Sequence, residues 1–187
     1  ALRLVELLHL LVTPVPFAHR RRGHLRESVL LMSRGRRCRS AWAPHLAAAR
    51  AAILDACDGL PQRRVAVVLG SGLLQDVPLA DLAARFARVD LVDAVHLWPA
   101  RLRARAHPNV RLVTADLALR IDRPDPLAAL CGGADVDFVV SANLEELVGK
   151  MNALTDRPTP MRAPLTMAPS ASPGCSTNSD DLAPAKV

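Results

Sequence analysis

The sequence predicts an α/β protein in which a Rossmann-like parallel sheet is flanked by an N-terminal helical region and a disordered C-terminal tail. Between residues 65 and 141, short apolar runs rich in β-branched residues alternate with segments of helical pattern. The runs are almost continuously apolar, as is typical of parallel strands that are covered on both faces. The chain has 187 residues, of which 50% are hydrophobic, and this is enough to bury the core of one such domain.

The first 64 residues have a helical pattern and form a predicted N-terminal cap, 1–64. Its expected helices run from Leu2 to Val12, from Leu25 to Cys38 and from Ala41 to Cys57. In the third helix we expect Pro44 in the first turn, where proline is tolerated, with Gly59 and Pro61 after the end. A lid over the ligand site is the expected role of this region.

The first of these helices is predicted to be amphipathic rather than a signal peptide, because Glu6 and His9 interrupt its apolar run. All apolar runs are shorter than the roughly 18 residues of a membrane span, so no membrane partner is expected. The cysteines have neither the spacing of a zinc site nor that of a disulfide framework: Cys38, Cys57, Cys131 and Cys175. These observations together predict a cytoplasmic protein.

Four strands are predicted in the sheet, at residues 65–69, 89–93, 110–114 and 136–141. The helices expected between them, at 78–87, 99–106 and 126–130, make right-handed crossovers. A further helix at 144–154 completes a predicted cofactor-binding domain at 65–154. Residues 155–187 are rich in Pro, Ser, Thr and Ala and have few bulky apolar residues, which predicts a disordered tail.

Glycine, aspartate and asparagine residues stand where the predicted strands end. They are Gly70 and Gly72 after the first strand, Asp93 at the end of the second, Asp116 after the third and Asn143 after the fourth. In a doubly wound sheet, ligands bind beyond the carboxyl ends of the strands, where neighbouring crossovers go to opposite faces. We therefore expect one crevice to collect all five residues.

These residue types suit a nucleotide-like ligand. Gly70 and Gly72 allow a positive φ and a close approach of the ligand to backbone amides. Asp93 is placed to accept hydrogen bonds from ribose hydroxyls, and Asp116 to accept one from the exocyclic amine of a base. At each single position a plain turn or a helix cap is the alternative. It is the conjunction at βα spacing that favours a nucleotide-type cofactor.

The stretch from Val65 to Asn143 resembles the cofactor-binding half of the class I S-adenosylmethionine-dependent methyltransferases. Val-Val-Leu-Gly-Ser-Gly at 67–72 is similar to their first motif, Leu-Val-Asp at 91–93 to the acidic second-strand motif, Thr-Ala-Asp at 114–116 to the adenine-contact motif, and Asp-Phe-Val-Val-Ser-Ala-Asn at 137–143 to the fourth-strand motif. The resemblance implies S-adenosylmethionine as the cofactor, with Gly70, Ser71 and Gly72 along its methionyl part, Asp93 on the ribose, and Asp116 with Leu117 at the adenine.

The chain also departs from that family. Val68 stands where many members have an acidic residue, and Leu74 where they have a third glycine. The predicted sheet has four strands where the family has seven, so activity is in doubt and no catalytic residue is assigned. Asn143 is either a residue of the ligand site or the N-cap of the helix that follows it.

Two other functions are open: an NAD(P)-binding Rossmann-type enzyme and a non-catalytic α/β interaction module. The dinucleotide motif needs a third glycine at the position of Gln75, which disfavours the first of these. The formal charge of +6 comes from a chain whose only lysines are Lys150 and Lys186, and we interpret it as a bias toward arginine. Nucleic acid is therefore not favoured as a partner, and the scarcity of aromatic residues agrees. The methyl acceptor and the oligomeric state are not predicted.

Overall fold

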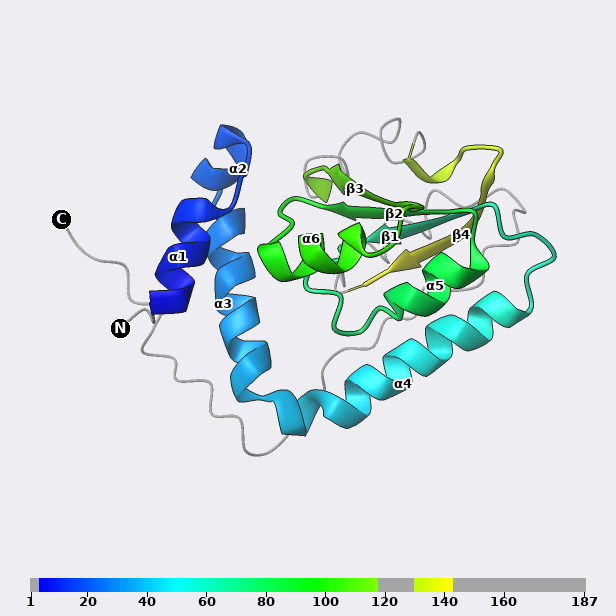
Figure 1. Ribbon diagram of the computed structural model, residues 1–187, viewed down its shortest axis with the longest axis horizontal. Coiled ribbons are helices and arrows are strands. Elements are labelled where there is room, and N and C mark those ends of the chain that lie inside the picture. Colours follow the sequence, from blue (N-terminus) through cyan, green and yellow to red (C-terminus); the bar gives the residue numbers. More distant parts are fainter. Residues whose placement is uncertain (1–3, 118–129, 143–187) are drawn as a thin grey trace.

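The computed structural model of the chain describes residues 4–117 and 130–142. These residues contain one parallel sheet with the strand order β3-β2-β1-β4, shown in Figure 1. The strands are β1 (Val65–Leu69), β2 (Arg88–Asp93), β3 (Val110–Thr114) and β4 (Val136–Ser141). Each begins and ends within one residue of its predicted position, so the α/β Rossmann-like fold predicted from the sequence is confirmed.

The strand order reverses direction at β1. From β1 the chain moves outward to β2 and then β3, and it returns to place β4 on the opposite side of β1. Parallel pairing puts the carboxyl ends of all four strands at one edge of the sheet. The gap beyond β1 and β4 is therefore the topological switch point at which ligands of such folds bind.

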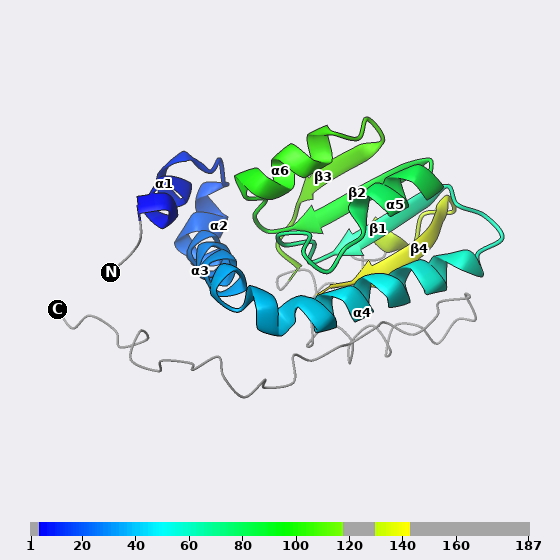
Figure 2. The ribbon, with the colours of Figure 1, turned by 60° about the horizontal axis from the view of Figure 1, so that its bottom comes forward.

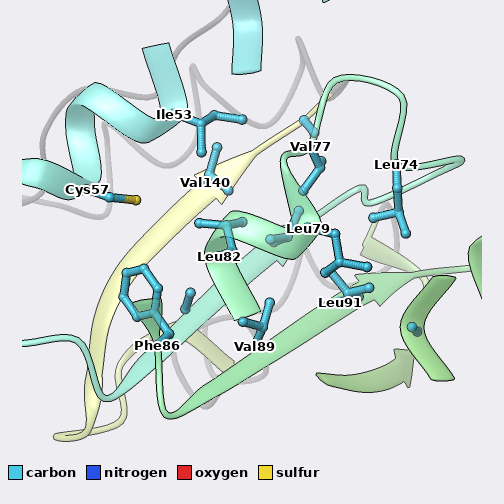
Figure 3. Close-up of a cluster of buried hydrophobic side chains, with 14 of the residues drawn as sticks. Ile53, Cys57, Leu74, Val77, Leu79, Leu82, Phe86, Val89, Leu91 and Val140 are labelled. Atoms are coloured by element: carbon cyan, nitrogen blue, oxygen red, sulfur yellow. The ribbon is translucent and has the colours of Figure 1, made fainter. Parts of the chain in front are cut away.

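One face of the sheet packs against α4 (Arg39–Asp58), α5 (Leu79–Arg85) and α6 (Trp98–Arg105). Figure 3 shows Ile53 and Cys57 of α4 and Leu82 of α5 in one cluster with residues of β2 and β4. Full burial of a leucine such as Leu82 contributes about 1.5–3 kcal/mol. Although α4 precedes residue 65, it contributes to the same core as the strands.

The two faces of β1 belong to two separate clusters. Ala66 and Val68 pack toward the cluster with α4 and α5, whereas Val65, Val67 and Leu69 pack on the opposite face with Val92 and Leu117. This alternation follows from the period of two along a strand. All five residues of β1 are buried, which explains why its sequence is continuously apolar.

Three further helices lie beyond the carboxyl ends of the strands, as Figure 2 shows for α3. They are α1 (Leu4–Val12), α2 (Phe17–Arg21) and α3 (His24–Arg37). Leu25, Val29 and Met32 of α3 pack on Val95 and Leu97 in the segment after β2. The helix α2 was not predicted, because five residues are too few to show a helical period.

Pro44 lies in the interior of α4 rather than in its first turn, which corrects the expected start of this helix. The helix begins at Arg39, directly after Cys38 separates it from α3. Because proline has no N–H, the helix continues past Pro44 without the bond to the carbonyl of Ser40. The predicted helix at 126–130 is outside the described residues except for its last residue. The helix at 144–154 and the tail at 155–187 are wholly outside them.

Candidate functional site

A pocket of about 340 Å³ lies beyond the carboxyl ends of the strands. The strand ends provide Gly70, Gly72, Asp93, Asp116, Leu117 and Ala142. The helix α3 provides His24, Glu27, Ser28 and Leu31, and the loops provide Leu73, Ala94, Val95 and Leu97. The pocket therefore lies between the sheet edge and α3.

The glycine loop after β1 has the left-handed backbone that its sequence predicts. Gly70 has φ 66° and Gly72 has φ 49°. The N–H groups of Gly70 and Ser71 both donate to the carbonyl oxygen of Val92, at 2.9 and 3.2 Å. A Cβ built on Gly72 meets only the carbonyl oxygen of Gly70, at 3.8 Å. The glycine here is needed for its φ, and the space beside it is open.

Asp93 holds the glycine loop in place. Its Oδ2 accepts a hydrogen bond from the N–H of Gly72 at 2.6 Å, and its Oδ1 accepts one from the N–H of Val95 at 3.3 Å. Hydrogen bonds to a carboxylate are stronger than neutral ones, typically by about a factor of two. The acidic end of β2 therefore fixes the shape of a loop that lines the pocket.

Asp116 joins the sheet to the N-terminal helices. Its Oδ2 accepts hydrogen bonds from Nη1 of Arg22 at 3.0 Å and from Nε2 of His24 at 2.9 Å. The Asp116 side chain is only 5% exposed, whereas that of Arg22 is 45% exposed. We refer to Arg22, His24 and Asp116 as the clasp. It connects residues more than 90 positions apart in the chain.

A second contact near the pocket also connects α2 to the sheet edge. Nδ1 of His19 lies 2.9 Å from the carbonyl oxygen of Ala94, which lines the pocket. Glu27 of α3 lines the same pocket and is largely exposed, and its carboxylate lies 3.9 Å from Nδ1 of His24. The α3 wall of the pocket thus offers both a carboxylate and an imidazole to a ligand.

His96 follows Asp93 by three positions but is not among the residues that line the pocket. Its side chain is 1% exposed, and its Nε2 lies 3.1 Å from the carbonyl oxygen of Val113 on β3. Burial lowers the pKa of His96 below its ordinary value of 6.5, with the charge of Arg101 acting in the same direction. The hydrogen bond to Val113 and the charge of Asp93 oppose this shift without reversing it.

The structure brings most of the predicted site residues together. Gly70, Gly72, Asp93, Asp116 and Leu117 all line the pocket. Ser71 is close to them in sequence, but it is 1% exposed and absent from the lining, and its Oγ has no hydrogen-bond partner among the described residues. Asn143 lies outside the described residues, and Ala142 before it lines the pocket.

The pocket residues contributed by α3 were not predicted from the sequence. His24, Glu27, Ser28 and Leu31 recur at the spacing of one helical face, and this pattern is visible in the sequence. The pattern shows that they share a face, but it does not show that this face covers the sheet edge. That information comes from the packing of the neighbouring Leu25, Val29 and Met32.

The pocket has the chemistry of a site for a small organic ligand. Its apolar walls come from side chains such as Leu31, Leu73 and Leu97, and its polar groups from Asp93, Asp116 and the glycine loop. In the part of the chain that the structure describes, no group of three or more His, Cys, Asp and Glu side chains is arranged to hold a metal ion. Comparisons of the chain with models of protein families, with curated proteins and with solved structures gave no match.

Proposed function

We propose that the chain binds S-adenosylmethionine in this pocket and is a methyltransferase-like protein. The observation that carries the proposal is the convergence of three strand-end motifs on one pocket at the switch point of the sheet. The volume of about 340 Å³ is within the range of small-molecule sites. The resemblance of the same motifs to those of methyltransferases selects this cofactor over other nucleosides.

The proposed roles follow from the chemistry of each residue. The glycine loop would run along the methionyl part of the cofactor, because Gly72 leaves open space beside the backbone. Asp93 would accept hydrogen bonds from the ribose hydroxyls, and Asp116 with Leu117 would contact the adenine. The methyl group of bound S-adenosylmethionine is transferred by an in-line displacement, in which positioning of the acceptor does most of the work.

The clasp competes with the ligand for the Asp116 carboxylate. An adenine amine that approaches Asp116 meets a carboxylate oxygen that already accepts two hydrogen bonds. The ligand must therefore share this carboxylate with Arg22 and His24 or move the segment that carries them. The same contacts support the lid role expected for the N-terminal region.

Calorimetric titration of the full chain with S-adenosylmethionine, with its demethylated product and with NAD tests the proposal. We expect the first two ligands to bind and NAD to bind much more weakly. Asp93→Asn should weaken binding by roughly 10-fold to 100-fold, because it removes a charged acceptor. Asp90→Asn is the matched control, since Asp90 lies on the same strand, pairs with Arg88 and does not line the pocket.

The alternatives give different results in the same titration. Binding of NAD alone would show a dinucleotide enzyme and overturn the proposal. Absence of binding by all three ligands would favour an interaction module whose glycine loop is only a turn. Equal weakening by Asp90→Asn and Asp93→Asn would show that the loss comes from the fold rather than from the pocket.

A further inference from the structure

The helix α1 presents most of its apolar side chains to solvent and its polar side chains to the protein, while Leu10 packs inward against the α3 cluster. Six of its nine residues are apolar and exposed: Leu4, Val5, Leu7, Leu8, Leu11 and Val12. Glu6 is buried, and it accepts a hydrogen bond from Ser33 of α3. Surface helices normally have the opposite arrangement. The outer face of α1 is therefore suited to an apolar environment outside the molecule.

The segment of residues 4–39, which contains α1, α2 and α3, also carries the whole formal charge of the protein. Residues 4–39 hold eight arginines and two glutamates, whereas the rest of the chain holds sixteen basic and sixteen acidic residues. The net charge of +6 thus belongs entirely to α1, α2, α3 and the start of α4. A single-sign field of this kind attracts anionic partners.

The arginines lie beside the exposed apolar groups. Phe17, the first residue of α2, is 74% exposed, and the guanidinium of Arg21 lies 5.8 Å from the centre of its ring. Arg20 donates a hydrogen bond to the carbonyl oxygen of Leu10 in α1 at 3.1 Å. Arg36 is exposed on α3, the helix against which α1 packs. Guanidinium groups therefore lie on α2 and α3, next to the helix that carries the apolar face.

We propose that α1 and α2 bind the surface of a bilayer that contains anionic phospholipids. The outward leucines and Phe17 enter the boundary between headgroups and acyl chains, while the arginines contact lipid phosphates. Figures 1 and 2 show α1 on the side of α3 that faces away from the sheet, so a flat surface can reach its outer face. Among the described residues, no helix is long and apolar enough to cross a membrane. The proposal of a surface contact replaces the expectation of no membrane partner, which considered spanning segments alone.

Charge favours a lipid surface over a second copy of the chain as the occupant. A two-fold dimer brings the same patch of both subunits together. Arginines that border α1 in one copy would then face arginines of the other, and like charges at close range oppose association. An anionic bilayer presents the opposite sign. The proposal does not depend on the cofactor, because α1 does not line the pocket.

Co-sedimentation of the full chain with vesicles tests the proposal. We expect binding to phosphatidylcholine vesicles that contain phosphatidylserine, weaker binding to phosphatidylcholine alone, and a loss of binding as salt is raised. The double variant Leu8→Ser and Leu11→Ser should lower the partition coefficient at least tenfold, because two of the apolar anchors of α1 are lost. Arg21→Gln with Arg36→Gln should lower it roughly tenfold or more on the anionic vesicles only.

Leu102→Ser and Arg111→Gln are the matched controls. Leu102 is 60% exposed on α6, and Arg111 is exposed on β3, so both lie outside residues 4–39. These variants should bind vesicles as the unaltered chain does. Binding that is unchanged by Leu8→Ser with Leu11→Ser, or absent from both vesicle types, would overturn the proposal. A dimer in equilibrium sedimentation that this double variant dissociates, together with no vesicle binding, would identify α1 as an interface between copies.

Discussion

Leu74 has a left-handed backbone that few residues other than glycine adopt. Its φ is 58°, and it stands at the position where the methyltransferase motif has its third glycine. The side chain is 3% exposed and packs in the main core cluster. The backbone is fixed by a hydrogen bond from its N–H to the carbonyl oxygen of Ser71 at 3.0 Å. The left-handed conformation costs an L-residue roughly 1–2 kcal/mol.

Comparison of Leu74→Ala with Leu74→Gly measures this cost. Both variants lose the buried side chain, which destabilises the fold by about 2–5 kcal/mol. The alanine variant keeps the backbone strain, whereas the glycine variant releases it. Against this gain, glycine loses one buried methyl group, about 0.8 kcal/mol, and about 0.5–1 kcal/mol of chain entropy. At position 74 the two variants should therefore have nearly equal stability.

The same pair of substitutions at Leu82 provides the reference. Leu82 is fully buried in α5, where the helical backbone carries no strain for alanine. Glycine in a helix interior is about 1 kcal/mol less stable than alanine. The methyl and entropy contributions are similar at the two sites and cancel in the comparison. The glycine-minus-alanine difference at Leu82 should exceed that at Leu74 by about 1–2 kcal/mol. Urea unfolding of the four variants measures it, and equal differences at both sites would refute the argument.

Three further expectations concern single groups. Folded His96 resists protonation, so the free energy of unfolding should fall as the pH drops below about 6.5, where the unfolded chain gains the proton; His96→Gln should remove that part of the pH dependence in denaturant titrations. Burial raises the pKa of the Cys57 and Cys131 thiols to about 11, so a thiol reagent at pH 8 should modify the buried Cys57 only when the protein unfolds and should modify the half-buried Cys131 slowly; rapid labelling of Cys57 in the native protein would contradict this. Asp116→Asn should speed trypsin cleavage after Arg22, because it weakens the clasp, while Asp90→Asn should leave the cleavage rate unchanged.

The sheet could be predicted from the sequence because its signal is local. β1 is buried on both faces, and five consecutive apolar residues show this directly. The ends of the strands followed from the same runs, so Gly70, Asp93 and Asp116 could be placed at one edge. Parallel topology then brings them to one pocket without further information.

The N-terminal side of the site could not be predicted because its signals are long-range. Arg22 and His24 belong to a basic run that looks like a solvated surface, and their partner Asp116 is more than 90 residues away. The alternation of polar and apolar residues in α1 showed that the helix has two faces. It could not show that Glu6 faces α3 while most of the leucines face solvent, because that orientation depends on Ser33.

The two carboxylates of the pocket differ in what a ligand must displace. Asp93 accepts one backbone N–H on each oxygen, and a carboxylate oxygen has two lone pairs, so ribose hydroxyls can bind beside these contacts. On Asp116 a single oxygen, Oδ2, accepts from both Arg22 and His24, and the carboxylate is buried. A ligand that binds through Asp93 keeps the glycine loop intact, whereas one that binds through Oδ2 of Asp116 must compete with Arg22 and His24. If the proposed cofactor binds, Asp93→Asn should therefore lower its affinity directly, while His24→Ala should raise it by releasing Asp116, and a loss of affinity in His24→Ala would instead make His24 a ligand contact.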